Sequence, residues 1–96
     1  MKGVFPKGVA WVRGEFVDIS EAHIPILDWG FLRSDATYDV VHVWKGRFFL
    51  LDKHIDRFFM SLKKLRMPCE ISRHKLKKIL AGCVKHSGLE NAYVEM

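Results

Sequence analysis

The sequence contains few of the residues that build metal centres or disulfide frameworks. Only two of its 96 residues are cysteine, Cys69 and Cys83, and neither belongs to a CxxC pair or to a paired histidine pattern. Two isolated thiols do not make the disulfide framework of a small secreted domain, and their spacing is not that of zinc ligands. We therefore expect no metal site and a reducing, cytoplasmic environment.

Long apolar runs, internal repeats and low-complexity tracts are also missing. No stretch reaches the about 18 consecutive apolar residues of a membrane-spanning helix. The first residues, MKGVFPKGVAW, lack the apolar segment of a signal peptide. We expect a soluble protein without a membrane partner.

Acidic residues are fewer than basic ones. The chain carries 16 Lys and Arg against 11 Asp and Glu, a formal net charge of +5. Such an excess can serve an anionic ligand or a nucleic-acid surface. The one local concentration, at residues 73–78, has no aromatic residue interleaved with its basic ones. We expect no nucleic-acid partner, and a basic binding module is the alternative to an enzyme.

The order of the elements predicts an α+β fold. Residues 8–19 alternate on both sides of Arg13-Gly14, which is typical of a short β-hairpin. Residues 37–44 are β-branched and aromatic, and after the Lys45-Gly46 turn residues 47–51 return as a second strand. The length allows one domain with a modest core.

Apolar periodicity predicts two amphipathic helices that pack on an antiparallel sheet formed by these hairpins. Asp52 can cap a helix over residues 53–66, and Pro68 blocks its continuation. Ser72 can cap a second helix that ends at Gly88. The apolar stripes are Ile55, Phe58, Phe59, Leu62 and Leu65 in the first helix and Leu76, Ile79, Leu80, Cys83 and Val84 in the second.

Side chains in the strand at 37–44 alternate between two faces. Tyr38, Val40, His42 and Trp44 share one face, and Asp39, Val41 and Val43 share the other. Because both faces carry apolar residues, we expect both to be covered.

The last residues, 91–96, begin another strand pattern in which the sequence stops. A strand edge with nothing to close it is unfavourable. We therefore expect residues 1–96 to form one truncated domain of a longer protein.

This ordered set of elements resembles the class IV (fold type IV) pyridoxal-phosphate-dependent aminotransferases over roughly residues 8–96. The motifs that carry the resemblance are GFLRSDATYDVV at residues 30–41, His-Ile-Asp-Arg at residues 54–57 and Tyr-Val-Glu at residues 93–95. The pattern is closest to (R)-selective amine transaminases, followed by D-amino-acid aminotransferases. Branched-chain aminotransferases usually have Gly in place of Val40 and Arg in place of Glu95.

The resemblance implies the N-terminal small domain of a homodimeric enzyme. Such an enzyme uses pyridoxal 5′-phosphate to transfer an amino group between an amine or amino acid and an α-keto acid. Arg57 would bind the cofactor phosphate, since a guanidinium offers a fork of donors and keeps its charge. Four further residues would shape the substrate pocket, and Arg33 could compensate the charge of Glu95 in it. These four are Tyr38, Val40, Tyr93 and Glu95.

Spacing alone leaves other interpretations of these residues open. Arg57 falls on the helix side away from the apolar stripe, as a solvated arginine would, and Arg33 can be an exposed loop residue. Tyr38 and Val40 can be core residues.

The resemblance puts the catalytic Schiff-base lysine downstream of Met96, so we expect no catalytic residue in this chain. The 96 residues alone are expected to be inactive. The alternative is a non-catalytic α+β fragment.

Overall fold

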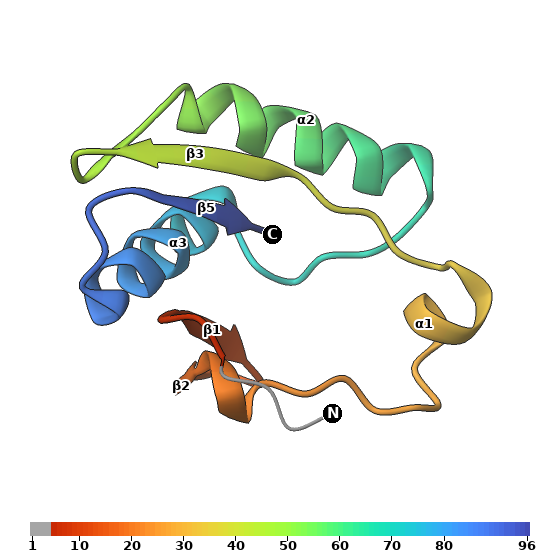
Figure 1. The fold of residues 1–96 in the computed structure, drawn as a ribbon. Helices are drawn as coiled ribbons and strands as arrows, with labels where there is room; N and C mark the ends of the chain where they lie inside the picture. The colour runs from red at the N-terminus through yellow and green to blue at the C-terminus, as the bar shows by residue number, and fades with distance from the viewer. Residues whose placement is uncertain (1–4) are drawn as a thin grey trace.

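The computed structural model describes residues 5–96, and their elements form two antiparallel sheets and three α-helices (Figure 1). The predicted α+β class is confirmed. In chain order the elements are β1 (Val9–Val12), β2 (Glu15–Asp18), the 3-10 turn η1 (Ile19–Glu21), α1 (Trp29–Arg33), β3 (Val40–Trp44), β4 (Arg47–Phe48), α2 (Leu51–Lys64), α3 (Arg73–Ser87) and β5 (Ala92–Glu95).

Both predicted hairpins form, although the return strand of the second covers only Arg47–Phe48 of the expected residues 47–51. Their turns have the left-handed backbone that tight hairpins require. β1 pairs with β2 across Arg13 and Gly14, whose φ angles are 53° and 84°. β3 pairs with β4 across Lys45 and Gly46, whose φ angles are 50° and 76°. Positive φ at both central positions matches the twist of the flanking strands, and glycine adopts it without steric cost.

The second sheet brings the last strand beside the middle of the chain. Its order is β4-β3-β5, and β5 runs antiparallel to β3. The register pairs Val40 with Glu95 and His42 with Tyr93. Beyond the ladder, the backbone groups of Asp39 and Met96 exchange two hydrogen bonds of 3.0 and 2.9 Å. The start of β3 is therefore fixed to the end of β5.

The two long helices cover one face of this sheet. α2 packs along β3, and α3 contacts β5 and the β1–β2 hairpin (Figure 1). Val41 and Val43 are completely buried on the covered face. Ile55 of α2 meets Leu76 and Leu80 of α3 in the core. This packing removes one apolar face of the sheet and one stripe of each helix from water.

The helix ends follow the sequence signals for α3 but not for α2. Ser72 accepts a hydrogen bond from the backbone N–H of Lys75, and Gly88 ends α3 with a φ of 69°. The prediction that Asp52 caps the first helix is wrong, because the chain leaves β4 through a left-handed Leu50 and α2 begins at Leu51. Asp52 lies in the first turn, where its carboxylate suits the positive end of the helix.

The expectation that both faces of β3 are covered is wrong in the part of the chain that the structure describes. The helices lie on the face of Asp39, Val41 and Val43, whereas Trp44 is 57% exposed on the opposite face. The neighbouring Tyr93 of β5 is 76% exposed. Leu65, assigned to the core stripe of the first helix, lies beyond the end of α2 and is 53% exposed.

None of the helices among residues 5–96 has the length and apolar character that crossing a bilayer requires.

Close packing at Gly82 generates a testable prediction. A Cβ added to this residue of α3 would lie 2.5 Å from Cζ of Phe16, whose ring also packs on His86 at a centroid distance of 4.5 Å. Gly82→Ala should stabilise α3 by about 1 kcal/mol through its higher helix propensity. In the wild type the clash with the Phe16 ring opposes this gain. We therefore expect the substitution to be less favourable in the wild-type background than in Phe16→Ala by about 1 kcal/mol or more.

Urea unfolding of the full-length wild type, the two single variants and the double variant measures this difference. Equal effects of Gly82→Ala in both backgrounds would show that the hairpin does not rest on this helix in solution.

Candidate functional site

A buried carboxylate directly before β3 organises a polar cluster with two side chains of α2. The Asp39 side chain is only 4% exposed. Its Oδ2 accepts a hydrogen bond of 2.7 Å from Nε of Arg57, and its Oδ1 accepts one of 2.9 Å from Nη2. Nδ1 of His54 lies 2.7 Å from the same Oδ1. One carboxylate thus binds two side chains of α2 at once.

Strand and helix periodicity together produce this cluster. Alternation along β3 turns Asp39 towards the helices, together with Val41 and Val43. His54 and Arg57 are three residues apart in α2 and so share one face of the helix. The predicted solvent-side location of Arg57 is confirmed in part: its side chain is 67% exposed, yet its Nε and Nη2 reach inward to the sheet.

Charge pairing determines the protonation of the cluster. The hydrogen bonds from Arg57 lower the pKa of Asp39 from 3.8 to about 2, with His54 assisting and burial opposing. The carboxylate in turn raises the pKa of Arg57. Asp39 is therefore ionised at neutral pH, and because a carboxylate has no proton to donate, Nδ1 of His54 carries the proton of their hydrogen bond.

The cluster leaves donor capacity for an anion. Within residues 5–96 the hydrogen bonds of Arg57 involve Nε and Nη2 but not Nη1. The side chain as a whole is 67% exposed, so the donors of Nη1 are left for a ligand. A planar fork that is already charged and partly immobilised fits a phosphate group better than a mobile lysine would.

A second group of predicted residues lies on the uncovered face of the same sheet. Val40 and Glu95 are cross-strand partners, and Tyr93 is paired with His42. The rings of Tyr93 and His42 stack at a centroid distance of 5.0 Å. Tyr38 lies two residues before the strand and is 69% exposed. The structure thus gathers Val40, Tyr93 and Glu95 on one face.

Arg33 is not part of this gathering. It ends α1, and its guanidinium lies over the ring of Trp29, 4.9 Å from the centroid. Among the described residues Arg33 has no hydrogen bond or ion pair with Glu95. The short helix itself was not foreseen in the sequence analysis, which allowed only that Arg33 is an exposed loop residue.

Sequence reasoning missed three residues of these two groups. Asp39 and His54 complete the polar cluster, and His42 lies between Tyr93 and Trp44 on the open face. The alternation along β3 already assigned Asp39 and His42 to opposite faces. The alternation does not show where α2 packs, and this packing is what brings Arg57 to the buried carboxylate of Asp39.

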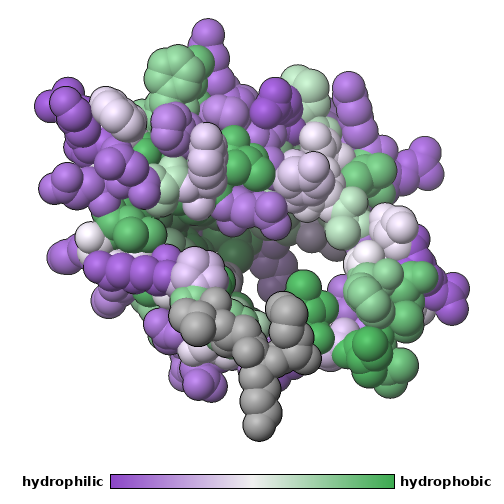
Figure 2. All heavy atoms as spheres, in the orientation of Figure 1, coloured by the Kyte–Doolittle hydropathy of each residue, from purple (hydrophilic) through white to green (hydrophobic). Residues whose placement is uncertain are grey.

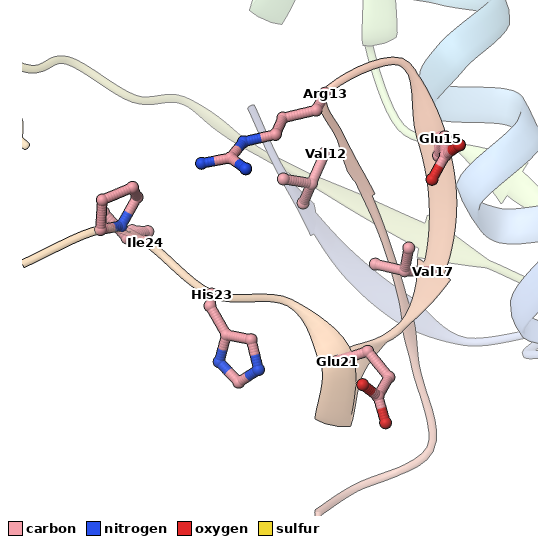
Figure 3. A pocket seen from close by; sticks show the side chains of 8 residues that line it. Val12, Arg13, Glu15, Val17, Glu21, His23 and Ile24 are labelled. Carbon is pink, nitrogen blue, oxygen red and sulfur yellow. The ribbon is translucent and has the colours of Figure 1, made fainter.

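The other features of the molecule carry less chemistry. A shallow pocket of about 320 Å³ beside the β1–β2 hairpin has Glu15, Glu21 and His23 in its lining, and these side chains project separately (Figure 3). A hollow of about 860 Å³ with largely apolar walls lies between β1 and β5, and α3 lines part of it (Figure 2). Residues 5–96 contain no group of three or more His, Cys, Asp or Glu suited to a metal ion.

The basic run at 73–78 is partly neutralised. Arg73 forms an ion pair with Asp56, and Nζ of Lys77 lies 3.0 Å from Oδ1 of Asp52. Both acidic partners belong to α2, so these charges link two helices instead of forming one uniform basic surface.

The depressed pKa of Asp39 predicts how stability changes with acid. Because its folded pKa lies below the unfolded value of 3.8, ionised Asp39 stabilises the fold fully above that value, and the contribution is lost as the pH falls through about 2. The wild type should lose up to about 2 kcal/mol more than Asp39→Asn between about pH 5 and pH 2. Urea unfolding of both full-length proteins across this range tests the prediction, and parallel losses would contradict it.

Comparison with known proteins identifies the family. The model of the family described as amino-transferase class IV matches residues 36–96. The chain is 29% identical over 87 residues to a D-alanine aminotransferase of Listeria monocytogenes, covering 88% of this chain and 30% of that protein. The chain therefore spans about a third of the length of this curated relative.

Solved structures agree in fold. A branched-chain amino acid aminotransferase of T.th., solved with pyridoxamine 5′-phosphate, superposes with a TM-score of 0.84 at 24% identity, covering 96% of this chain and 32% of that one. The branched-chain amino acid aminotransferase of Escherichia coli gives a TM-score of 0.84 at 18% identity, covering 93% and 30%. The predicted resemblance is confirmed, and the chain belongs to the class IV aminotransferase family.

Proposed function

We propose that this chain is the small domain of a pyridoxal-phosphate-dependent aminotransferase. The intact protein transfers an amino group between an amine or amino acid and an α-keto acid. The observation that carries this proposal is Arg57, a guanidinium fixed on one side by Asp39 and open on the other. Membership of a family whose members use this cofactor supports it.

In this proposal Arg57 holds the phosphate of the cofactor. Its exposed Nη1 donates to a phosphate oxygen, and its charge is kept at every physiological pH. When bound, the cofactor supplies the electron sink for breaking the bond between the substrate Cα and its hydrogen. The lysine that anchors the cofactor and moves this proton is expected outside residues 1–96, so we expect the 96 residues alone to be inactive.

The open face of the β3–β5 sheet forms one wall of the substrate pocket. Val40 and Tyr93 supply apolar surface, and Glu95 supplies a negative charge beside them. Tyr38 extends this wall at the start of the strand. Arg33 compensates Glu95 only if α1 moves towards the sheet in the complete protein, because it contacts Trp29 in the described chain.

A large apolar surface supports a larger assembly. Six large side chains between residues 24 and 32 are each more than half exposed, at the green lower right of Figure 2. These are Ile24, Ile26, Leu27, Trp29, Phe31 and Leu32. A surface of this kind is normally covered by another domain or subunit. A homodimer is a prediction from the resemblance, and a cytoplasmic location is a prediction from the two isolated cysteines and the lack of a signal-peptide pattern.

A basic binding module is the weaker candidate. The pairing of Arg73 with Asp56 and of Lys77 with Asp52 removes two of its four cations from a nucleic-acid surface.

Replacement of Arg57 tests the phosphate site. In the full-length protein, Arg57→Met should raise the dissociation constant of pyridoxal 5′-phosphate at least about tenfold, because a charge-assisted contact is lost. Pyridoxal, which has no phosphate, should bind almost as before. Equilibrium titration with both compounds measures the difference.

Arg73→Met is the matched control, since Arg73 is a surface arginine paired with Asp56. If Arg57→Met lowers the affinity for both compounds equally, Arg57 does not bind the phosphate.

Replacement of Glu95 tests the pocket wall. A fixed negative charge repels a substrate carboxylate at short range, so Glu95→Gln should raise kcat/KM for amino-acid donors relative to amines without a carboxylate. We expect a relative gain of about tenfold. Steady-state kinetics with one donor of each kind measures it. An unchanged ratio would remove Glu95 from the wall.

A further inference from the structure

We propose that Asp39 is a positioning residue that fixes the orientation of the Arg57 guanidinium for a phosphate ligand. The inference rests on the proposed phosphate-binding role of Arg57 and adds a residue that does not itself touch the ligand. The hydrogen bonds, the burial and the charge of the cluster support it.

Arg57 cannot orient itself. Its side chain emerges from α2 and is 67% exposed, and a long side chain in solvent samples many rotamers. The two bonds to Asp39, from Nε and Nη2, define the plane of the guanidinium and its rotation. A bidentate pair of this kind provides geometric specificity that a single contact does not.

Asp39 is itself rigid. Its backbone N–H and carbonyl both bond to Met96, which continues the β3–β5 ladder. Oδ1 binds His54 in addition to Arg57, so both carboxylate oxygens are engaged. The chain of contacts therefore runs from the sheet backbone through a buried carboxylate to the exposed guanidinium.

Electrostatic attraction for a phosphate does not explain why a carboxylate lies beside Arg57. A carboxylate beside Arg57 cancels much of the positive charge that would attract a phosphate. The pair improves binding only if orientation contributes more than this lost attraction. Removal of the carboxylate therefore has two effects of opposite sign, and the measured sign shows which one dominates.

The location of Asp39 links the oriented guanidinium of Arg57 to the proposed substrate wall. Its neighbours Tyr38 and Val40 belong to the open face of the sheet, whereas Asp39 belongs to the covered face. Three consecutive residues thus connect the phosphate anchor to the substrate wall. A phosphate held through Asp39 has a fixed distance from that wall.

Asp39→Asn in the full-length protein tests the inference, because it keeps the shape of the side chain and removes its charge. We expect the dissociation constant of pyridoxal 5′-phosphate to rise at least about fivefold and that of pyridoxal to change less than about twofold. Asp56→Asn, the same change on the exposed surface of α2, should alter neither. Unchanged or tighter binding of pyridoxal 5′-phosphate to Asp39→Asn would overturn the proposal.

A double variant separates positioning from a general structural effect. Asp39→Asn combined with Arg57→Met leaves no buried charge without a partner, and it should bind pyridoxal 5′-phosphate as Arg57→Met alone does. A further loss in the double variant would show that Asp39 acts independently of Arg57 and would overturn the proposal. If Asp39→Asn alone does not fold, a further loss in the double variant still overturns the proposal.

The phosphate site and the positioning role fail in different ways. If Arg57→Met binds both compounds like the wild type, the proposed phosphate site itself is wrong. If Arg57→Met discriminates between them and Asp39→Asn does not, only the positioning role is wrong.

Discussion

The ion pair between Asp39 and Arg57 joins the sheet to the helix that covers it. An ionised carboxylate that is almost completely buried is unfavourable unless its oxygens are bonded, and here His54 and Arg57 satisfy both. This requirement fixes the rotation of α2 relative to β3. The apolar core of Val41, Val43 and Ile55 provides the attraction between the layers, whereas the polar cluster selects one of the ways in which they could pack.

β3 separates two kinds of chemistry by simple alternation. Its covered face contributes a carboxylate to a charged cluster, and its open face contributes side chains to a wall shared with β5. Because adjacent residues must point in opposite directions, a ligand that contacts both groups has to reach round the edge of the sheet or span it at the start of the strand. The paired backbones of Asp39 and Met96 hold β3 and β5 together at that end of the sheet.

Local patterns predicted most of the fold. Both hairpins, the caps Ser72 and Gly88 and the stripe of α3 depend on neighbouring residues, and each of these predictions is confirmed. The start of α2 was predicted wrongly, because it is set by the left-handed Leu50 and not by a capping side chain. The prediction that the second face of β3 is covered was also wrong. Hydropathy shows that a face is apolar, but it does not show whether another element among these residues packs on it.

The site was predictable only in part, for a related reason. Spacing placed Arg57 on the solvent side of its helix and Val40 on the same face as Tyr38, but the partner of an arginine across a layer depends on tertiary packing. Asp39 therefore could be assigned a face but not a role. Met96 is a similar case, because nothing in the last residues indicates that their backbone bonds back to Asp39.

The hollow between β1 and β5 affects how the isolated segment behaves in the laboratory. β5 is the outer strand of its sheet in the described chain, and the apolar walls of the hollow lie beside it. An outer strand next to apolar surface is a template for pairing with foreign strands. Preparations of these residues alone would therefore be prone to self-association as concentration rises, and a charged substitution along β5 offers a direct way to suppress it.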